Sequence, residues 1–206
     1  METILQTTNL SRQFGKKMAV NNVNMTIHKG DIYGFIGKNG AGKTTFMRLV
    51  LGTAFPTKGE IKLFGGEPFD KARRKIGSLI EAPGLYKNCT AYENLKQFSL
   101  IYGGTDAEIK EILSLVGLAD TGNKKAGKFS LGMRQRLGIA IALLGNPEFL
   151  VLDEPVNGLD PAGMKEVRDL ILKLNHEKNI TILISSHLLD ELSKIVTRYA
   201  VSYTHL

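Results

Sequence analysis

One segment of the chain combines the residue types that hold phosphate groups. Residues 37–44 read GKNGAGKT, which satisfies the pattern G-x-x-x-x-G-K-[ST]. Glycines let successive backbone amides point at an anion, and the start of a helix adds partial positive charge. Lys43 would then bridge the β- and γ-phosphates of a nucleotide, and the Thr44 hydroxyl would ligate Mg²⁺. The candidate nucleotide-binding residues of this loop are Gly37, Asn39, Gly40, Ala41, Gly42, Lys43, Thr44 and Thr45.

Two carboxylates follow a second apolar segment. Residues 150–155 read LVLDEP, so Asp153 and Glu154 come directly after a predicted strand. In an open α/β sheet, the carboxyl ends of the strands border the ligand crevice. Asp153 is therefore a candidate Mg²⁺ ligand. Glu154 is a candidate general base for the attacking water, a role typically worth about 10²–10⁴ in rate. Alone, the pair would indicate only the start of a turn, but beside a phosphate-binding loop it indicates nucleotide hydrolysis.

The surrounding elements predict how these residues are positioned. Helical periodicity dominates from about 91 to 144, where Thr105 and Glu108 predict a capping box. The continuous apolar run at 149–152 is typical of a parallel strand that is buried on both faces. The other predicted elements are strands at 31–36, 60–64 and 181–184 and helices at 43–51 and 162–174. This order predicts a parallel-sheet core that is interrupted by a helical insertion.

Composition narrows the class of protein. The chain has 206 residues and a single cysteine, which fits one α/β domain over residues 1–206 in a reducing compartment. The net charge of +7 is dispersed, without the aromatic-interleaved basic stripe that binds single strands, so we expect no nucleic-acid partner. No apolar run reaches the roughly 18–20 residues that span a bilayer, and the N-terminus lacks a signal-peptide core. We therefore expect a cytoplasmic chain for which any membrane role acts through a partner.

A third segment resembles the signature of a known family, the nucleotide-binding subunits of ATP-binding-cassette (ABC) transporters. Residues 129–136 read FSLGMRQR. Ser130 and Gly132 are kept, whereas Leu131 and Met133 replace the usual glycine and glutamine. A serine before an apolar helix is, by itself, only an N-cap. In this family, the same helix start points at the γ-phosphate of ATP that the partner subunit holds, which assigns Ser130 and Gly132 to a nucleotide site shared across a dimer.

The resemblance covers residues 4 to about 197 in the family's order, and it implies a fold. That fold is a P-loop NTPase (RecA-like) α/β core with a parallel sheet, an N-terminal antiparallel β subdomain and a helical subdomain at about 88–146. Residues 157–160 (NGLD) resemble the loop that communicates across the dimer, so Asp160 joins the candidate site. His187 resembles the switch histidine that contacts the γ-phosphate and orients Glu154 or the water. Phe14 lies where the family stacks an aromatic ring on adenine.

The function that this resemblance implies is ATP hydrolysis coupled to transmembrane transport. Two copies of an ATP-binding subunit would sandwich two ATP molecules with Mg²⁺, each between the phosphate-binding loop of one copy and Ser130 of the other. Glu154 and His187 would be the catalytic residues. Transmembrane permease subunits would be separate chains, which places this chain peripherally on the inner face of the plasma membrane.

One position departs from the family in an informative way. Residues 76–86 read IGSLIEAPGLY, and Glu81 replaces the glutamine that usually ligates Mg²⁺ and senses the membrane partner. A carboxylate can also ligate Mg²⁺, but near the γ-phosphate it adds like-charge repulsion that a metal or a proton must screen. Glutamate with these flanks resembles the bacitracin-resistance and lantibiotic-immunity transporters. This resemblance implies export of antimicrobial peptides.

The last residues fit the family poorly. Residues 200–206 (AVSYTHL) match no expected strand, and VSYTHL resembles translated adapter sequence. We therefore expect residues 201–206 to be a non-native tail on a chain that is truncated at its C-terminus.

Two alternative functions remain to be weighed against transport. One is a soluble ABC ATPase that acts on ribosomes or DNA. Ribosome-acting members carry two cassettes in one chain, and DNA-repair members insert a long coiled coil between the phosphate-binding loop and the signature. This sequence has one such loop and no sustained heptads. The other is a P-loop GTPase or small-molecule kinase, but the guanine motif N-K-x-D is missing and the signature would be unexplained.

Overall fold

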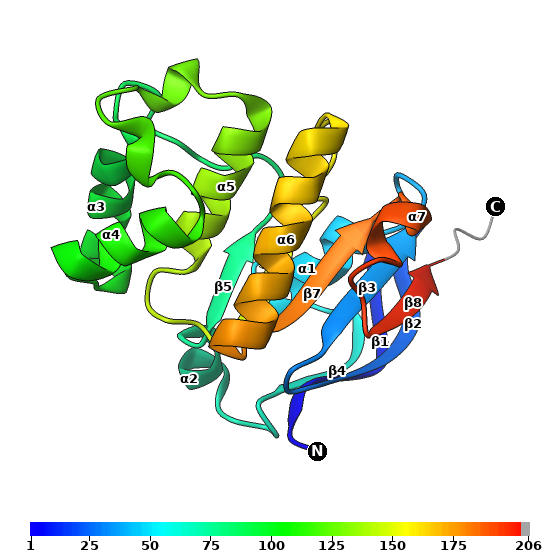
Figure 1. The fold of residues 1–206 in the computed structure, drawn as a ribbon. Coiled ribbons are helices and arrows are strands. Elements are labelled where there is room, and N and C mark those ends of the chain that lie inside the picture. The colour runs from blue at the N-terminus through cyan, green and yellow to red at the C-terminus, as the bar shows by residue number, and fades with distance from the viewer. Residues whose placement is uncertain (203–206) are drawn as a thin grey trace.

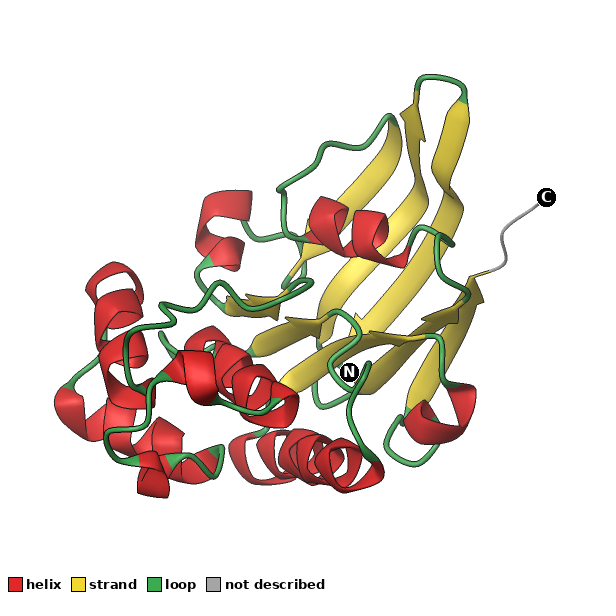
Figure 2. Ribbon diagram, turned by 90° about the horizontal axis from the view of Figure 1, so that it is seen from above, coloured by secondary structure: helices red, strands yellow, loops and turns green. Residues whose placement is uncertain are grey.

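Two β-sheets of different topology lie on opposite sides of one helix in the computed structural model, which describes residues 1–202 (Figures 1 and 2). The antiparallel sheet has the order β2-β1-β4, with β1 (Thr3–Phe14), β2 (Lys17–His28) and β4 (Lys58–Leu63). The parallel sheet has the order β5-β6-β7-β3-β8, with β3 (Ile32–Gly37), β5 (Ile76–Leu79), β6 (Phe149–Leu152), β7 (Thr181–Ser186) and β8 (Arg198–Ser202). The predicted parallel core and antiparallel β subdomain are confirmed.

The helices fall into three groups. The helix between the sheets is α1 (Lys43–Val50). The helical insertion, residues 91–142 between β5 and β6, contains α3 (Ala91–Tyr102), α4 (Asp106–Leu115), the 3₁₀ turns η1 (Ala119–Thr121) and η2 (Ala126–Lys128), and α5 (Leu131–Ala142). The others are α2 (Phe69–Arg73), α6 (Pro161–Lys178) and α7 (Leu189–Leu192). None of the described helices is long and apolar enough to cross a membrane.

The parallel sheet is buried on both faces because its strands serve two hydrophobic cores. On β6, Phe149 and Val151 belong to the core shared with α1 and the antiparallel sheet. Leu150 and Leu152 belong to the core shared with α6 and the helical insertion. All four are fully buried, and each such side chain contributes roughly 1.5–3 kcal/mol of hydrophobic free energy. This packing fixes the carboxyl end of β6, where Asp153 and Glu154 follow.

Two capping boxes start the first helices of the insertion. The Thr105 hydroxyl of the predicted box accepts a hydrogen bond from the Glu108 amide at 3.3 Å, and Glu108 accepts one from the Thr105 amide at 2.6 Å. A second box joins Thr90 and Glu93 at the start of α3. There, the Thr90 amide and the Lys125 ammonium hold the pKa of the Glu93 carboxyl below its ordinary value. Each box satisfies helix-end amides that would otherwise lack partners.

The expectation that residues 200–206 contain no strand is wrong for the part that is described. Residues 198–202 form β8, which pairs in parallel with β3; Val201 lies opposite Ile36. The pairing uses backbone groups, so a strand edge can recruit a segment whatever its side-chain sequence. Residues 203–206 lie outside the described residues, and a foreign origin of residues 201–206 stays a prediction.

Candidate nucleotide-binding and hydrolysis site

The phosphate-binding loop connects β3 to α1 at the carboxyl edge of the parallel sheet. Gly40 and Gly42 have φ values of 82° and 85°, which side-chain-bearing residues rarely adopt. A Cβ atom on Gly42 would lie 1.9 Å from the Ala19 carbonyl oxygen of β2, so only glycine fits. Within the described chain, no side chain caps α1, and first-turn amides without a side-chain cap suit the binding of an anion.

Lys43, Glu154 and His187 form a continuous polar line across the ends of three strands. The Lys43 ammonium donates to the carbonyls of Gly37 at 2.6 Å and Lys38 at 3.0 Å, and it lies 3.2 Å from Glu154 Oε1. The other carboxylate oxygen of Glu154 lies 2.8 Å from His187 Nδ1. A carboxylate held between an ammonium and an imidazole at the mouth of a phosphate-binding loop can accept a proton from water.

A second polar line, beside the first, is made of oxygen atoms. The Thr44 hydroxyl donates to Asp153 Oδ2 at 2.6 Å, and the Ser185 hydroxyl donates to Asp153 Oδ1 at 2.6 Å. The Glu154 amide donates to the same serine oxygen at 2.9 Å, so Ser185 of β7 fixes both acidic residues. Ser185 was missed in the sequence, where the only signal is its place near the end of an apolar strand.

The oxygen donors fit Mg²⁺ better than a metal that needs a full protein cage. The described residues contain no group of three or more His, Cys, Asp or Glu side chains that could hold an ion. Mg²⁺ usually binds through one or two side-chain oxygens together with water and substrate phosphates. Thr44 and Asp153 supply such a pair of hard oxygen ligands next to the loop.

Phe14 shares a cavity of about 320 Å³ with the phosphate-binding loop. The cavity is lined by Phe14, Lys17, Ala19, Asn39, Gly40, Gly42, Lys43, Thr44, Thr45 and Glu154. The Phe14 side chain is half-exposed, and the Arg12 guanidinium lies 4.5 Å from the centre of its ring. An exposed aromatic face beside an anion site suits a nucleobase. Lys17 was missed, because only the β1–β2 hairpin brings it to the loop.

The residues that the resemblance assigns to a site shared across a dimer lie outside the cavity of the phosphate-binding loop. Two of them form hydrogen bonds within their own helices. The exposed Ser130 caps α5, where its hydroxyl accepts from the Met133 amide at 3.2 Å. The exposed Asp160 caps α6, where its carboxylate accepts from the Gly163 amide at 3.2 Å. A Cβ atom on Gly132 would lie 3.8 Å from Leu159, so the starts of the two helices are neighbours. Ser130, Gly132 and Asp160 do not line the cavity of the phosphate-binding loop.

Glu81 is the predicted metal ligand that the structure does not join to the other two. Its carboxylate oxygen lies 2.6 Å from Arg48 Nη2, rather than against Thr44 or Asp153. Both members of this ion pair are largely exposed. A role for Glu81 as a metal ligand therefore stays a prediction.

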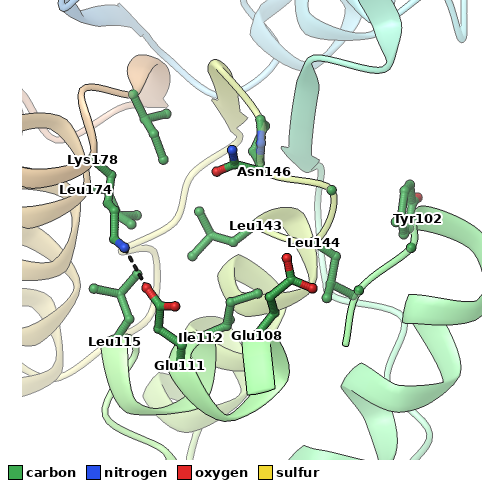
Figure 3. A pocket seen from close by; sticks show the side chains of 15 residues that line it. Tyr102, Glu108, Glu111, Ile112, Leu115, Leu143, Leu144, Asn146, Leu174 and Lys178 are labelled. Atoms are coloured by element: carbon green, nitrogen blue, oxygen red, sulfur yellow. Dashed lines mark hydrogen bonds and ion pairs between the residues drawn. The ribbon is translucent and has the colours of Figure 1, made fainter. Parts of the chain in front are cut away.

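A larger cavity of about 500 Å³ lies between the helical insertion and α6 (Figure 3). Its walls include Ile112, Leu143 and Leu174, and Figure 3 shows Lys178 pointing at Glu111, with an ion-pair distance of 2.6 Å. None of the sequence-predicted site residues lines it. Volume does not identify the site, since a cavity of about 640 Å³ beside β2 and Gly40 is larger still. The phosphate-binding amides, the lysine and Glu154 instead point to the cavity of about 320 Å³.

Comparisons with known proteins agree with the fold. The sequence profile of the ABC transporter family matches residues 20–157. The bacitracin transport ATP-binding protein BcrA of Bacillus licheniformis is 50% identical over 205 residues, which cover 98% of this chain and 67% of that protein. The lantibiotic transport ATP-binding protein SrtF of Streptococcus pyogenes is 46% identical over 192 residues, covering 93% and 83%. The chain thus spans about two thirds of the length of its bacitracin-transport relatives.

Solved structures give the same answer. The structure of cbiO1 from Clostridium perfringens, part of the ABC transporter complex cbiONQ, matches with a TM-score of 0.87 and 27% identity, covering 98% of this chain and 85% of that one. The dimeric post-hydrolysis structure of the cassette MJ0796 bound to ADP and Pi matches with a TM-score of 0.81 and 26% identity, covering 97% and 94%.

A P-loop α/β core with an antiparallel sheet on one side and a helical insertion after β5 defines the class of ATP-binding cassettes. The profile match spans more than half of the chain, and the sequence relatives agree with it. The chain belongs to the ABC transporter family.

Proposed function

We propose that this chain binds ATP with Mg²⁺, hydrolyses it, and powers an ABC transporter that exports antimicrobial peptides of the bacitracin or lantibiotic kind. The observation that carries the hydrolysis is the contact of Glu154 with both Lys43 and His187. The bacitracin and lantibiotic relatives support the cargo class by their names. Those names also favour transport over a soluble ATPase that acts on ribosomes or DNA.

The contacts support the following roles. The loop amides and Lys43 bind the phosphates, and Phe14 stacks on the base. Mg²⁺, bound by Thr44 and Asp153, would offset the charge that develops on the phosphate oxygens. Glu154 takes the proton of the attacking water, and His187 holds the carboxylate in place through its 2.8 Å contact. Ser185 keeps Asp153 and Glu154 in register with each other.

A second copy completes the site in this proposal. Ser130, Gly132 and Asp160 stand at the exposed starts of α5 and α6, away from their own chain's loop. Their helix ends suit the γ-phosphate of ATP on a partner copy. The dimeric form of the MJ0796 cassette supports this arrangement. Separate permease subunits would hold the two ATP-binding copies at the inner face of the plasma membrane. The permease subunits would also determine which cargo is transported.

The test compares drug susceptibility of cells that express this protein together with the transmembrane permease subunits that the proposal requires. The parental form should protect against bacitracin or a lantibiotic, and Glu154→Gln should remove the protection. Glu60→Gln, an exposed carboxylate on β4, is the matched control and should protect like the parental form. If neither the parental nor the control form protects, the peptide cargo is wrong. If Glu154→Gln protects as well as the parental form, hydrolysis does not drive the protection.

A further inference from the structure

An arginine offsets the negative charge that Glu81 would bring near the phosphates of a nucleotide. Glu81 stands where the family usually has an uncharged glutamine. It follows β5 by two residues, and the last residue of β5, Leu79, accepts a hydrogen bond from the Asp153 amide at 2.8 Å. The structure gives Glu81 a counter-charge: Arg48 Nη2 lies 2.6 Å from Glu81 Oε1. Sequence patterns did not indicate Arg48, because it lies in the last turn of α1, far from Glu81 in the chain.

Arg48 lies on the same helix as the candidate Mg²⁺ ligand Thr44. Residues four positions apart share a helix face, and they are separated by about 6 Å along the axis. Side chains of a helix lean toward its N-terminus, which for Arg48 means toward Thr44 and the phosphate-binding loop. The ion pair therefore joins Glu81 to a residue of α1 that lies one helical turn from Thr44, the partner of Asp153 in the candidate metal site.

The ion pair between Arg48 and Glu81 contributes little to folding stability and can be replaced by another contact of the carboxylate. Its side chains are 47% and 63% exposed, and ion pairs of this kind contribute little to stability. Glu81 also has a φ value of 61°, a left-handed conformation that is unfavourable for a residue with a side chain. A weak pair on a strained turn can be given up when a divalent cation offers the carboxylate a stronger partner.

We propose that Arg48 is a positioning residue for Glu81. The Arg48 guanidinium offsets the charge of the Glu81 carboxylate and competes with the bound metal for that carboxylate. Without Arg48, the Glu81 carboxylate can move toward the nucleotide site, where its negative charge repels the phosphates of ATP bound without Mg²⁺. With Mg²⁺ present, the cation screens the same carboxylate. The inference rests on the proposed binding of ATP with Mg²⁺ and gives a reason why this chain tolerates glutamate at position 81.

The experiment measures ATP binding to the purified chain in EDTA and in Mg²⁺, with hydrolysis blocked by Glu154→Gln in every variant. The readout is the ratio of the two dissociation constants. Arg48→Gln should raise this ratio by about three- to tenfold, as expected for one partly screened charge within about 10 Å. Arg48→Lys should restore it, and the Arg48→Gln effect should shrink as salt concentration rises.

The decisive comparison repeats Arg48→Gln in a Glu81→Gln background. If Arg48 acts through Glu81, the change in the ratio disappears there. If the change persists unaltered, Arg48 acts on the nucleotide directly and the inference is overturned, as it is if Arg48→Gln leaves the ratio unchanged. Lys96→Gln is the control, because Lys96 and Asp106 form a pair of similar exposure on the helical insertion.

The outcomes for the two proposals are separable. A chain that does not bind ATP in Mg²⁺ at all contradicts the proposed function. A chain that binds ATP with a normal Mg²⁺ dependence, and whose ratio ignores Arg48, contradicts only the role of Arg48. A thermal melt of each variant checks folding, and exposed residues such as these should leave the melting temperature nearly unchanged.

Discussion

Two regions of the molecule carry predicted site residues, and they are built in opposite ways. At the ends of β3, β6 and β7, buried or half-buried side chains contact one another across the sheet, as Lys43, Glu154 and His187 do. At the starts of α5 and α6, the exposed Ser130 and Asp160 bond only to amides of their own helices in the described contacts. The first region is organised within one chain, whereas the second presents helix ends that a second molecule can use.

The largest expected effect belongs to the first region. Glu154→Gln keeps the size of the side chain but removes the group that accepts the proton of water. We expect ATP hydrolysis by the purified chain to fall about 10²–10⁴-fold, while ATP-bound dimers accumulate. Phosphate release and size-exclusion chromatography with ATP measure the two results. Hydrolysis at the parental rate would show that Glu154 is not the base.

A similar loss of hydrolysis with a different cause is expected from the second region. Ser130→Arg places a large cation at the start of α5, where it would block a partner's ATP. We expect hydrolysis to be abolished while ATP binding by the single chain, measured by equilibrium dialysis, stays within about twofold. This small binding change is expected because Ser130 lies outside the chain's own cavity.

The matched control for that variant is Thr105→Ala, which removes an N-cap from α4 without touching the signature. It should cost about 0.5–2 kcal/mol of unfolding free energy and leave hydrolysis intact. Loss of ATP binding in Ser130→Arg, or loss of hydrolysis in Thr105→Ala, would contradict the separation of the two regions.

The smallest expected effect concerns Phe14, at the edge of the first region, and tests whether it contacts the nucleotide. Phe14→Ala should weaken ATP binding about 2- to 13-fold, the value of one aromatic stacking contact of about 0.5–1.5 kcal/mol, with little change in the maximal rate. Phe14→Tyr should bind like the parental chain. If both variants bind ATP equally well, Phe14 lines the cavity without stacking on the base.

Much of the fold could be predicted because local patterns and buried runs agree. The apolar run at 149–152 coincides with β6, and the predicted strand at 181–184 lies within β7 (Thr181–Ser186). The end of the chain could not be predicted, because β8 forms by backbone pairing with β3 and its side chains give a weak signal. The same reason applies to Lys17, which reaches the site only through a hairpin.

By itself, the sequence determined which chemical groups are present and in which local settings: a glycine-rich loop before a helix, two acids after a buried strand, and serine or aspartate before a helix. These depend on residues close together in the chain. The tertiary structure alone decided which side chains contact one another. Parallel pairing brings the ends of β3, β6 and β7 to one edge, so that Glu154 touches Lys43 and His187. The packing around α1 gives Glu81 an arginine partner that no local pattern could supply, because the contact joins residues distant in the sequence.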